Sequence, residues 1–176
     1  STSFNGKKQV GNAFLVTKGT TGTDTPTPPT TGEDYKSNIS WKLGNKAYDN
    51  TSVDNSKQYA MVNGVEVTQI LKLGASSGAG TATLIIPKGT SKLSFYGFAW
   101  KGTEATLVAK VGGTEVAKEP LKGNDGVVKT APYTITVTAS DLHTVNFPTK
   151  LPVDTEVEIT TEEAKGRVVL FGFKAE

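Results

Sequence analysis

Few side chains of this 176-residue chain could carry out covalent chemistry. The chain has no cysteine, so thiol catalysis, thiolate metal sites and disulfide bonds are excluded. A Ser-His-Asp triad would have to use His143, the single histidine, with Asp141 nearby, but no Gly-x-Ser-x-Gly motif occurs. One histidine without cysteine also disfavours a zinc site. We therefore interpret His143 as a residue on or beside a strand.

Acidic residues could form the carboxylate pair of a glycosidase, which needs an acid and a nucleophile or base. Four glutamates lie near the C-terminus: Glu156, Glu158, Glu162 and Glu163. Glu156 and Glu158 alternate with Val157 and Ile159, and this period of two places both carboxylates on the solvent side of a strand. Because the pattern is ordinary for an outer sheet surface, we predict that the chain is not an enzyme.

Hard oxygen ligands for Ca²⁺ gather in the segment 48–55, which reads Tyr-Asp-Asn-Thr-Ser-Val-Asp-Asn. The candidate ligands are Asp49, Asn50 and Asp54. The segment lacks the residue order of an EF-hand, and Asx-rich turns are common without a metal. We expect no cofactor, with a structural calcium ion at these three residues as the alternative.

Aromatic side chains are the main indication of sugar binding, because sugar rings stack on exposed Trp and Tyr faces while polar groups fix the hydroxyls. Trp41 shares a strand face with apolar neighbours, which favours a place in the core. Trp100 lies at a strand end, where a loop could expose it, and Tyr48 borders an irregular segment. For each of these aromatic side chains, packing in the core is the default interpretation. If a glycan site exists, we expect it at Tyr48, Trp100, Asp49 and Asp54.

The charge pattern argues against polyanionic and membrane partners. The net charge is +2, and Arg167 is the single arginine among 19 basic residues. Reading of bases and bidentate clamping of phosphates favour arginine, so we expect no nucleic-acid binding. No apolar run approaches the roughly 20 residues that span a bilayer, so we expect no membrane insertion within this segment.

Composition divides the chain into three parts. Residues 1–18 predict a short β-hairpin, which could be the end of an upstream domain. Residues 19–33 form a linker, because Thr, Pro and Gly supply 13 of its 15 residues. From residue 34 to residue 176, short strand-like runs recur with turn residues between them. This third part is predicted to be one β-sandwich domain.

Two runs of this domain are apolar on both faces and must be covered on both sides. They are Lys92–Trp100 and Arg167–Phe173, and we expect them to be neighbours in the middle of a sheet, with segment 44–60 over their second face. Hairpin turns are predicted at Asn63-Gly64 and Gly112-Gly113. No window carries a helical period. The predicted fold is therefore an all-β, antiparallel β-sandwich or jelly roll of about eight or nine strands.

Several of these segments together resemble a known module. They are Ile70–Gly80, Thr81–Ile86 with the turn Pro87–Thr90, Leu93–Gly102, Ala131–Val137 and Phe171–Phe173. They resemble the C-terminal β-sandwich of surface lipoproteins from Bacteroides-type gut bacteria, over roughly residues 34–176. Such modules are jelly-roll-like, similar to galactose-binding-like domains, and have no assigned activity. Residues 1–18 resemble the last hairpin of the OB-like domains that precede such modules.

The resemblance implies an exported protein, at the cell surface or in the periplasm, with a lipid anchor upstream of this segment. The leading hypothesis is a monomeric, non-catalytic surface module that binds a glycan or polysaccharide by aromatic stacking and hydrogen bonds. One alternative is a structural, adhesion or spacer domain without a small ligand. The other is an accessory domain of an enzyme whose catalytic part lies upstream.

Overall fold

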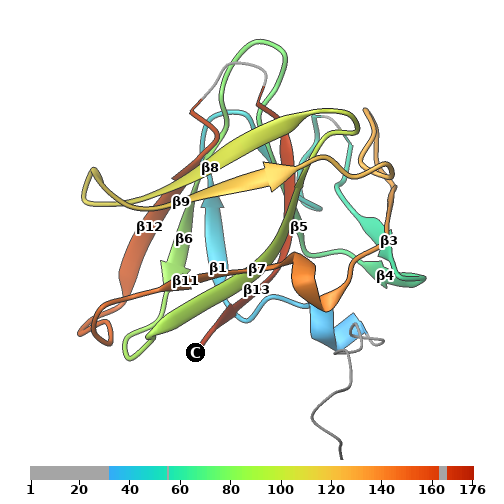
Figure 1. Ribbon diagram of the computed structural model, residues 1–176. Helices are drawn as coiled ribbons and strands as arrows, with labels where there is room; N and C mark the ends of the chain where they lie inside the picture. Colours follow the sequence, from blue (N-terminus) through green and yellow to red (C-terminus); the bar gives the residue numbers. More distant parts are fainter. Residues whose placement is uncertain (1–31, 55, 163–165) are drawn as a thin grey trace, which may run out of the picture.

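The computed structural model describes residues 32–54, 56–162 and 166–176 (Figure 1). The predicted hairpin at 1–18 and most of the linker lie outside these residues, and the end of the linker, Gly32 and Glu33, begins a 3-10 turn. None of the helices in the described ranges is long and apolar enough to cross a membrane. The elements are η2 (Gly32–Tyr35), β1 (Ser40–Leu43), β2 (Ala47–Tyr48), β3 (Ala60–Val62), β4 (Val65–Val67), β5 (Ile70–Leu73), β6 (Thr81–Ile86), β7 (Lys92–Ala99), β8 (Glu104–Val111), β9 (Thr114–Lys122), β10 (Tyr133–Ile135), η3 (Ala139–Asp141), β11 (Leu142–Asn146), β12 (Thr155–Thr160) and β13 (Val168–Ala175).

The strands form three sheets, and two of them make the sandwich. The first has the order β1-β6-β12-β8-β9 and the second the order β11-β7-β13-β5-β2. All their pairings are antiparallel. The predicted all-β sandwich is therefore confirmed, and so is the pairing of the two double-faced runs, β7 and β13. Within the described residues the strands number thirteen rather than eight or nine, because β3, β4 and β10 form a separate sheet and the two-residue β2 adds an edge to the second sheet.

Alternating side chains fill the space between the two large sheets. Along β12, Val157 and Ile159 are buried while Glu156 and Glu158 are exposed, as the alternation predicted. Leu84 from β6, Phe95 from β7 and Leu170 from β13 belong to the same core. This main core holds the two sheets face to face, as in other β-sandwiches.

The outer face of the second sheet carries a second core. A third sheet of order β10-β3-β4 covers it, with β10 parallel to β3 (Figure 1). Phe98 and Phe171 pack there against Val62 and Ile135. The expectation that segment 44–60 forms this cover is wrong, because Ala60 is the only apolar residue from the described part of that segment in the second core. The hairpin 60–67 and β10 alternate in burial and so supply the apolar face instead.

A bulge in β13 changes the face of the sheet on which its last residues lie. The register of β13 against β7 shifts between Phe171 and Lys174. Gly172 lies in this irregularity with a φ of 68°, a left-handed conformation that glycine adopts readily. As a result Phe171 enters the second core while Phe173 enters the main core, although residues two apart normally share one face.

Candidate functional site

A groove of about 540 Å³ opens where the edge strands of the two large sheets, β9 and β11, approach each other. Its polar lining consists of Glu104, Thr106, Lys122, Ser140, Asp141 and His143. Its apolar floor and side consist of Gly97, Phe98, Pro120 and Leu121. The groove therefore combines β7, β8, β9, η3 and β11 in one site.

The floor of the groove is a short stretch of β7 that lacks a strand partner on one side. The ladder between β11 and β7 ends at Leu142 opposite Tyr96. Gly123, just after β9, forms a parallel bridge with Ala99. Gly97 and Phe98 lie between these two contacts, so the chain has diverged from β7 on that side and left the hollow open.

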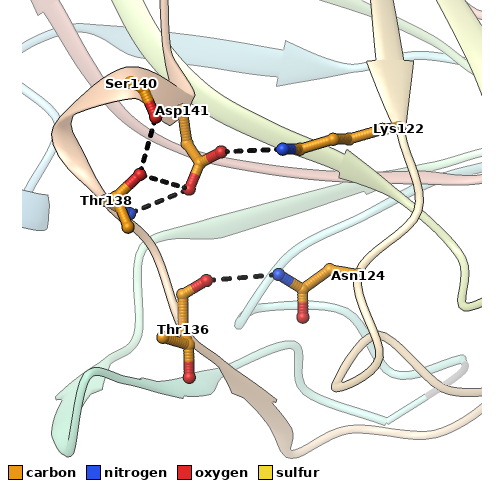
Figure 2. Close-up of polar contacts among 6 residues, drawn as sticks. All are labelled: Lys122, Asn124, Thr136, Thr138, Ser140 and Asp141. Carbon is orange, nitrogen blue, oxygen red and sulfur yellow. Dashed lines mark hydrogen bonds and ion pairs between the residues drawn. The ribbon is translucent and has the colours of Figure 1, made fainter.

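The η3 turn holds one acidic wall of the groove in a fixed position (Figure 2). Asp141 Oδ2 accepts hydrogen bonds from the backbone N–H of Thr138 at 2.8 Å and from its hydroxyl at 3.3 Å. The Thr138 hydroxyl also shares a hydrogen bond of 2.8 Å with the hydroxyl of Ser140. These local bonds close the turn at its N-terminal end, as a capping residue does, and orient the Asp141 carboxylate.

Two side-chain contacts join the end of β9 to the segment that leads into β11 (Figure 2). Lys122 Nζ lies 3.3 Å from Asp141 Oδ1. Two residues further on, the Asn124 amide donates to the carbonyl oxygen of Thr136 at 3.3 Å. The first contact connects the edges of the two large sheets, the second ties the loop after β9 to the residue that follows β10, and Lys122 and Asp141 face the groove.

His143 makes a further contact between the two edges. Its Nδ1 lies 3.1 Å from Glu119 Oε1 on β9, and its ring stacks on Phe95 with a centroid distance of 5.3 Å. No hydrogen bond among the described residues joins His143 to Asp141 or to a serine. The arrangement is thus that of a positioned imidazole beside a strand, as predicted, without the geometry of a nucleophilic triad.

Chemically, the groove offers fixed donors and acceptors above an apolar floor. Asp141 and Glu104 accept hydrogen bonds, Lys122 donates, and Thr106 does both. Phe98 and Leu121 are buried beneath them. A polyhydroxylated ligand presents the complementary surface, with hydroxyls at its rim and C–H groups on its face.

The structure brings two of the sequence-predicted site residues together, but around a cation. Trp100 is 8% exposed and Tyr48 is half-buried. Lys72 Nζ lies 4.8 Å from the centroid of the Tyr48 ring and 5.5 Å from that of Trp100. Arg167 Cζ lies 4.9 Å from the centroid of Trp100. Burial and these cations leave the Trp100 ring little surface for stacking on a sugar.

Asp49 and Asp54, the other two predicted residues, differ in burial and in hydrogen bonding. Asp49 is buried, and its carboxylate accepts three hydrogen bonds, from Trp41 Nε1 at 3.0 Å and from the N–H and hydroxyl of Thr51 at 2.8 and 2.6 Å. Asp54 is exposed and makes no hydrogen bond to Asp49. No group of three His, Cys, Asp or Glu side chains within the described ranges gathers to hold a metal. The calcium site with Asn50 stays a prediction.

Sequence reasoning missed most of the groove. Asp141 and His143 drew attention as a catalytic pair, whereas Lys122, Glu104 and Thr106 gave no signal. The groove forms only when β9 and η3, which lie apart in the sequence, meet over β7. The signal that was present is the turn sequence around Asp141, Thr-Ala-Ser-Asp, which matches a capping pattern.

Comparisons with known proteins give fold likenesses only. No protein-family model and no curated protein matches the sequence. The secreted serine protease VesC from Vibrio cholerae has a similar structure (TM-score 0.43, 10% identity, 81% of this chain covered), of which the chain spans about a quarter, 25%. A carbohydrate-binding module CBM36 in complex with calcium and xylotriose gives a TM-score of 0.40 and 15% identity, with 81% and 92% of the two chains covered. TmCBM61 in complex with β-1,4-galactotriose gives 0.37 and 12%, with 81% and 90% covered. TM-scores below 0.5 transfer no residue roles to this chain.

Proposed function

We propose that this β-sandwich is a non-catalytic module that binds a carbohydrate in the groove between β9 and η3. The observation that carries the proposal is the groove itself, in which Lys122 and the fixed Asp141 stand over the apolar floor of Phe98 and Leu121. We place the module, as a monomer, on an exported surface protein, in keeping with the lipoprotein modules that its sequence resembles.

Neighbouring hydroxyls of a sugar ring need a donor and an acceptor side by side. Lys122 and Asp141 provide such a pair, and their contact distance of 3.3 Å matches the spacing at which both could reach adjacent hydroxyls. Asp141 is already oriented by η3, so little conformational freedom is lost when it binds. Lys122 is exposed and can move to meet the ligand.

We expect the groove to favour neutral sugars over polyanions. Two carboxylates, Glu104 and Asp141, line it together with one lysine, Lys122. The lining therefore has no excess of positive charge to attract a polyanion. Shallow polar sites of this kind bind through a few hydrogen bonds, each contributing about 1 kcal/mol.

A glycan array followed by calorimetry on the best ligand tests the proposal. We expect Lys122→Ala and Glu104→Gln to weaken binding about tenfold each, the effect of roughly 1.4 kcal/mol. Lys42→Ala is the matched control, because Lys42 also forms an exposed ion pair, with Glu156 at 2.8 Å, on β1 away from the groove. Absence of any ligand would favour the structural or spacer role instead, and binding that the groove variants leave unchanged would place the binding site outside the groove.

A further inference from the structure

A cationic cluster lies on the outer face of the second sheet, formed by residues other than those that line the groove. We define it by Lys72 on β5, Trp100 directly after β7 and Arg167 directly before β13, with Tyr48 of β2 at its side. Tyr48 on β2 is paired with Lys72 on β5. Val168 on β13 is paired with Ala99 on β7, so one step beyond this pair Arg167 lies opposite Trp100. Strand pairing thus places all four side chains on one face.

Two positive charges in this cluster face each other without a carboxylate. The lysine ion pairs of the described chain involve other residues, and neither Lys72 nor Arg167 takes part in one. Lys72 is only 5% exposed. Burying a cation is unfavourable unless it is paired. The aromatic rings of Tyr48 and Trp100 supply part of the compensation through cation–π contacts.

Two buried donors of the same cluster lack an acceptor. They are Trp100 Nε1 and Arg167 Nε, which are the only buried side-chain polar atoms without a hydrogen-bond partner among the described residues. Native structures leave few buried donors unsatisfied, and each one calls for an explanation. Both belong to side chains that meet at the Trp100 ring, where Lys72 Nζ and Arg167 Cζ lie 5.5 and 4.9 Å from the ring centroid, so one negatively charged acceptor could serve all three groups.

We infer that Lys72, Trp100 and Arg167 form a binding site for an oxyanion, such as the carboxylate or sulfate group of an acidic ligand. Guanidinium N–H groups match the oxygens of a carboxylate or sulfate, and a hydrogen bond to an ionised acceptor is stronger than a neutral one. The indole N–H adds a neutral donor, and Lys72 adds a point charge. This site is independent of the groove, since none of its residues lines that hollow.

The electrostatics of Lys72 agree with this assignment. Burial and the neighbouring Arg167 lower the pKa of Lys72 below its ordinary value. An anion bound between the two cations would oppose both effects and raise that pKa. The cluster is thus poised to gain free energy from an anion, whereas ordinary surface lysines gain little.

The indole N–H resonances of the two tryptophans provide a direct test on the intact chain. Trp41 donates to Asp49 and serves as an internal reference, while Trp100 has a free N–H. We expect sodium sulfate, phosphate or glucuronate, but not sodium chloride at matched ionic strength, to shift the Trp100 signal saturably. Trp100→Phe identifies that signal.

Variants decide whether the shift reports the site. Arg167→Met should weaken binding about tenfold or more, as the loss of a charged hydrogen-bond partner does, while Lys42→Met and Lys122→Ala should leave it unchanged. A response to glucuronate alone would identify the ligand as a sugar carboxylate. A response to sulfate or phosphate would identify it as a tetrahedral oxyanion. Either result supports the inference. No saturable shift with any of the three, or a shift that Arg167→Met does not alter, overturns it. Because Lys122→Ala affects only the groove, failure of one site is distinguishable from failure of the other.

Discussion

Lys122 Nζ and Asp141 Oδ1 lie 3.3 Å apart and join the edges of the two large sheets, yet the two side chains are very unequal in exposure. The Lys122 side chain is 75% exposed, whereas that of Asp141 is 10% exposed. Asp141 is anchored by Thr138 within its own turn, so the aspartate is a structural part of the wall. Lys122 is the movable member of the pair.

Asp141→Ala is therefore expected to destabilise the domain more than Lys122→Ala. Loss of the carboxylate removes the bonds to Thr138, and loss of such a cap costs about 1 kcal/mol. Loss of an exposed lysine from an ion pair costs less than about 0.5 kcal/mol. Urea unfolding of both variants measures the difference. Equal losses would show that the ion pair, and not the turn, stabilises this edge.

The sequence allowed most of the large sheets to be predicted, because their signals are local. Lys92–Trp100 is apolar on both faces, and this alone requires a covered, central strand, as β7 is. The identity of the cover could not be predicted, since β10 pairs with β3 in parallel over a long separation in sequence. Periodicity gives the face of a strand but not its distant partner.

The candidate sites were harder to predict for the same reason. We expected Trp100 to be exposed because it lies at the end of a strand. Instead it packs in the second core together with Val127, and the backbone N–H of the next residue, Lys101, donates to the carbonyl oxygen of Val127 at 2.8 Å. Lys72 carried no signal in the sequence, because a lysine on a short strand usually faces solvent. Both facts depend on contacts between residues far apart in the sequence, Val127 with Trp100 and Lys72 with Tyr48, Trp100 and Arg167.

Asp49→Ala should destabilise the domain by about 2 to 3 kcal/mol, because it leaves the half-buried Trp41 N–H without its charged acceptor and frees the Thr51 turn. Asp54→Ala, at an exposed position, should change the free energy of unfolding by less than about 0.5 kcal/mol. Thermal unfolding in EDTA and in calcium chloride measures both. A calcium-dependent rise in Tm that both variants abolish would establish the calcium site predicted from the sequence.

Lys72→Met should stabilise the ligand-free domain at neutral pH by about 1 kcal/mol, since it removes a buried cation beside Arg167 and keeps contact with Tyr48. The pKa of Lys72 is lowered in the folded state, so between that value and the ordinary 10.5 the folded protein holds fewer protons than the unfolded one. Wild-type stability therefore rises with pH in this window, and the advantage of the variant shrinks.

Urea unfolding of the wild type and of Lys72→Met at neutral and alkaline pH checks this expectation. The difference between the two proteins isolates Lys72 from the other groups that titrate at high pH. Lys42→Met controls for the loss of a lysine at an exposed site. A variant that is less stable than the wild type at neutral pH would mean that the cation–π contacts outweigh the repulsion.

Tyr133 makes the stability of the second core sensitive to high pH. Its hydroxyl donates to Gln58 Oε1 at 2.6 Å, and burial raises the pKa of Tyr133 from 10.0 to about 12. Because the folded state keeps this proton longer than the unfolded state, the contribution is full below pH 10 and is lost as pH rises through about 12. A pKa shift of this size corresponds to about 2 to 3 kcal/mol.

Tyr133→Phe should cost about 1 kcal/mol at pH 8 through the lost hydrogen bond, and should flatten the decline of stability above pH 10. Unfolding free energies measured from pH 8 to pH 12 compare the two proteins, and an equally steep decline in both would assign the alkaline transition to other groups.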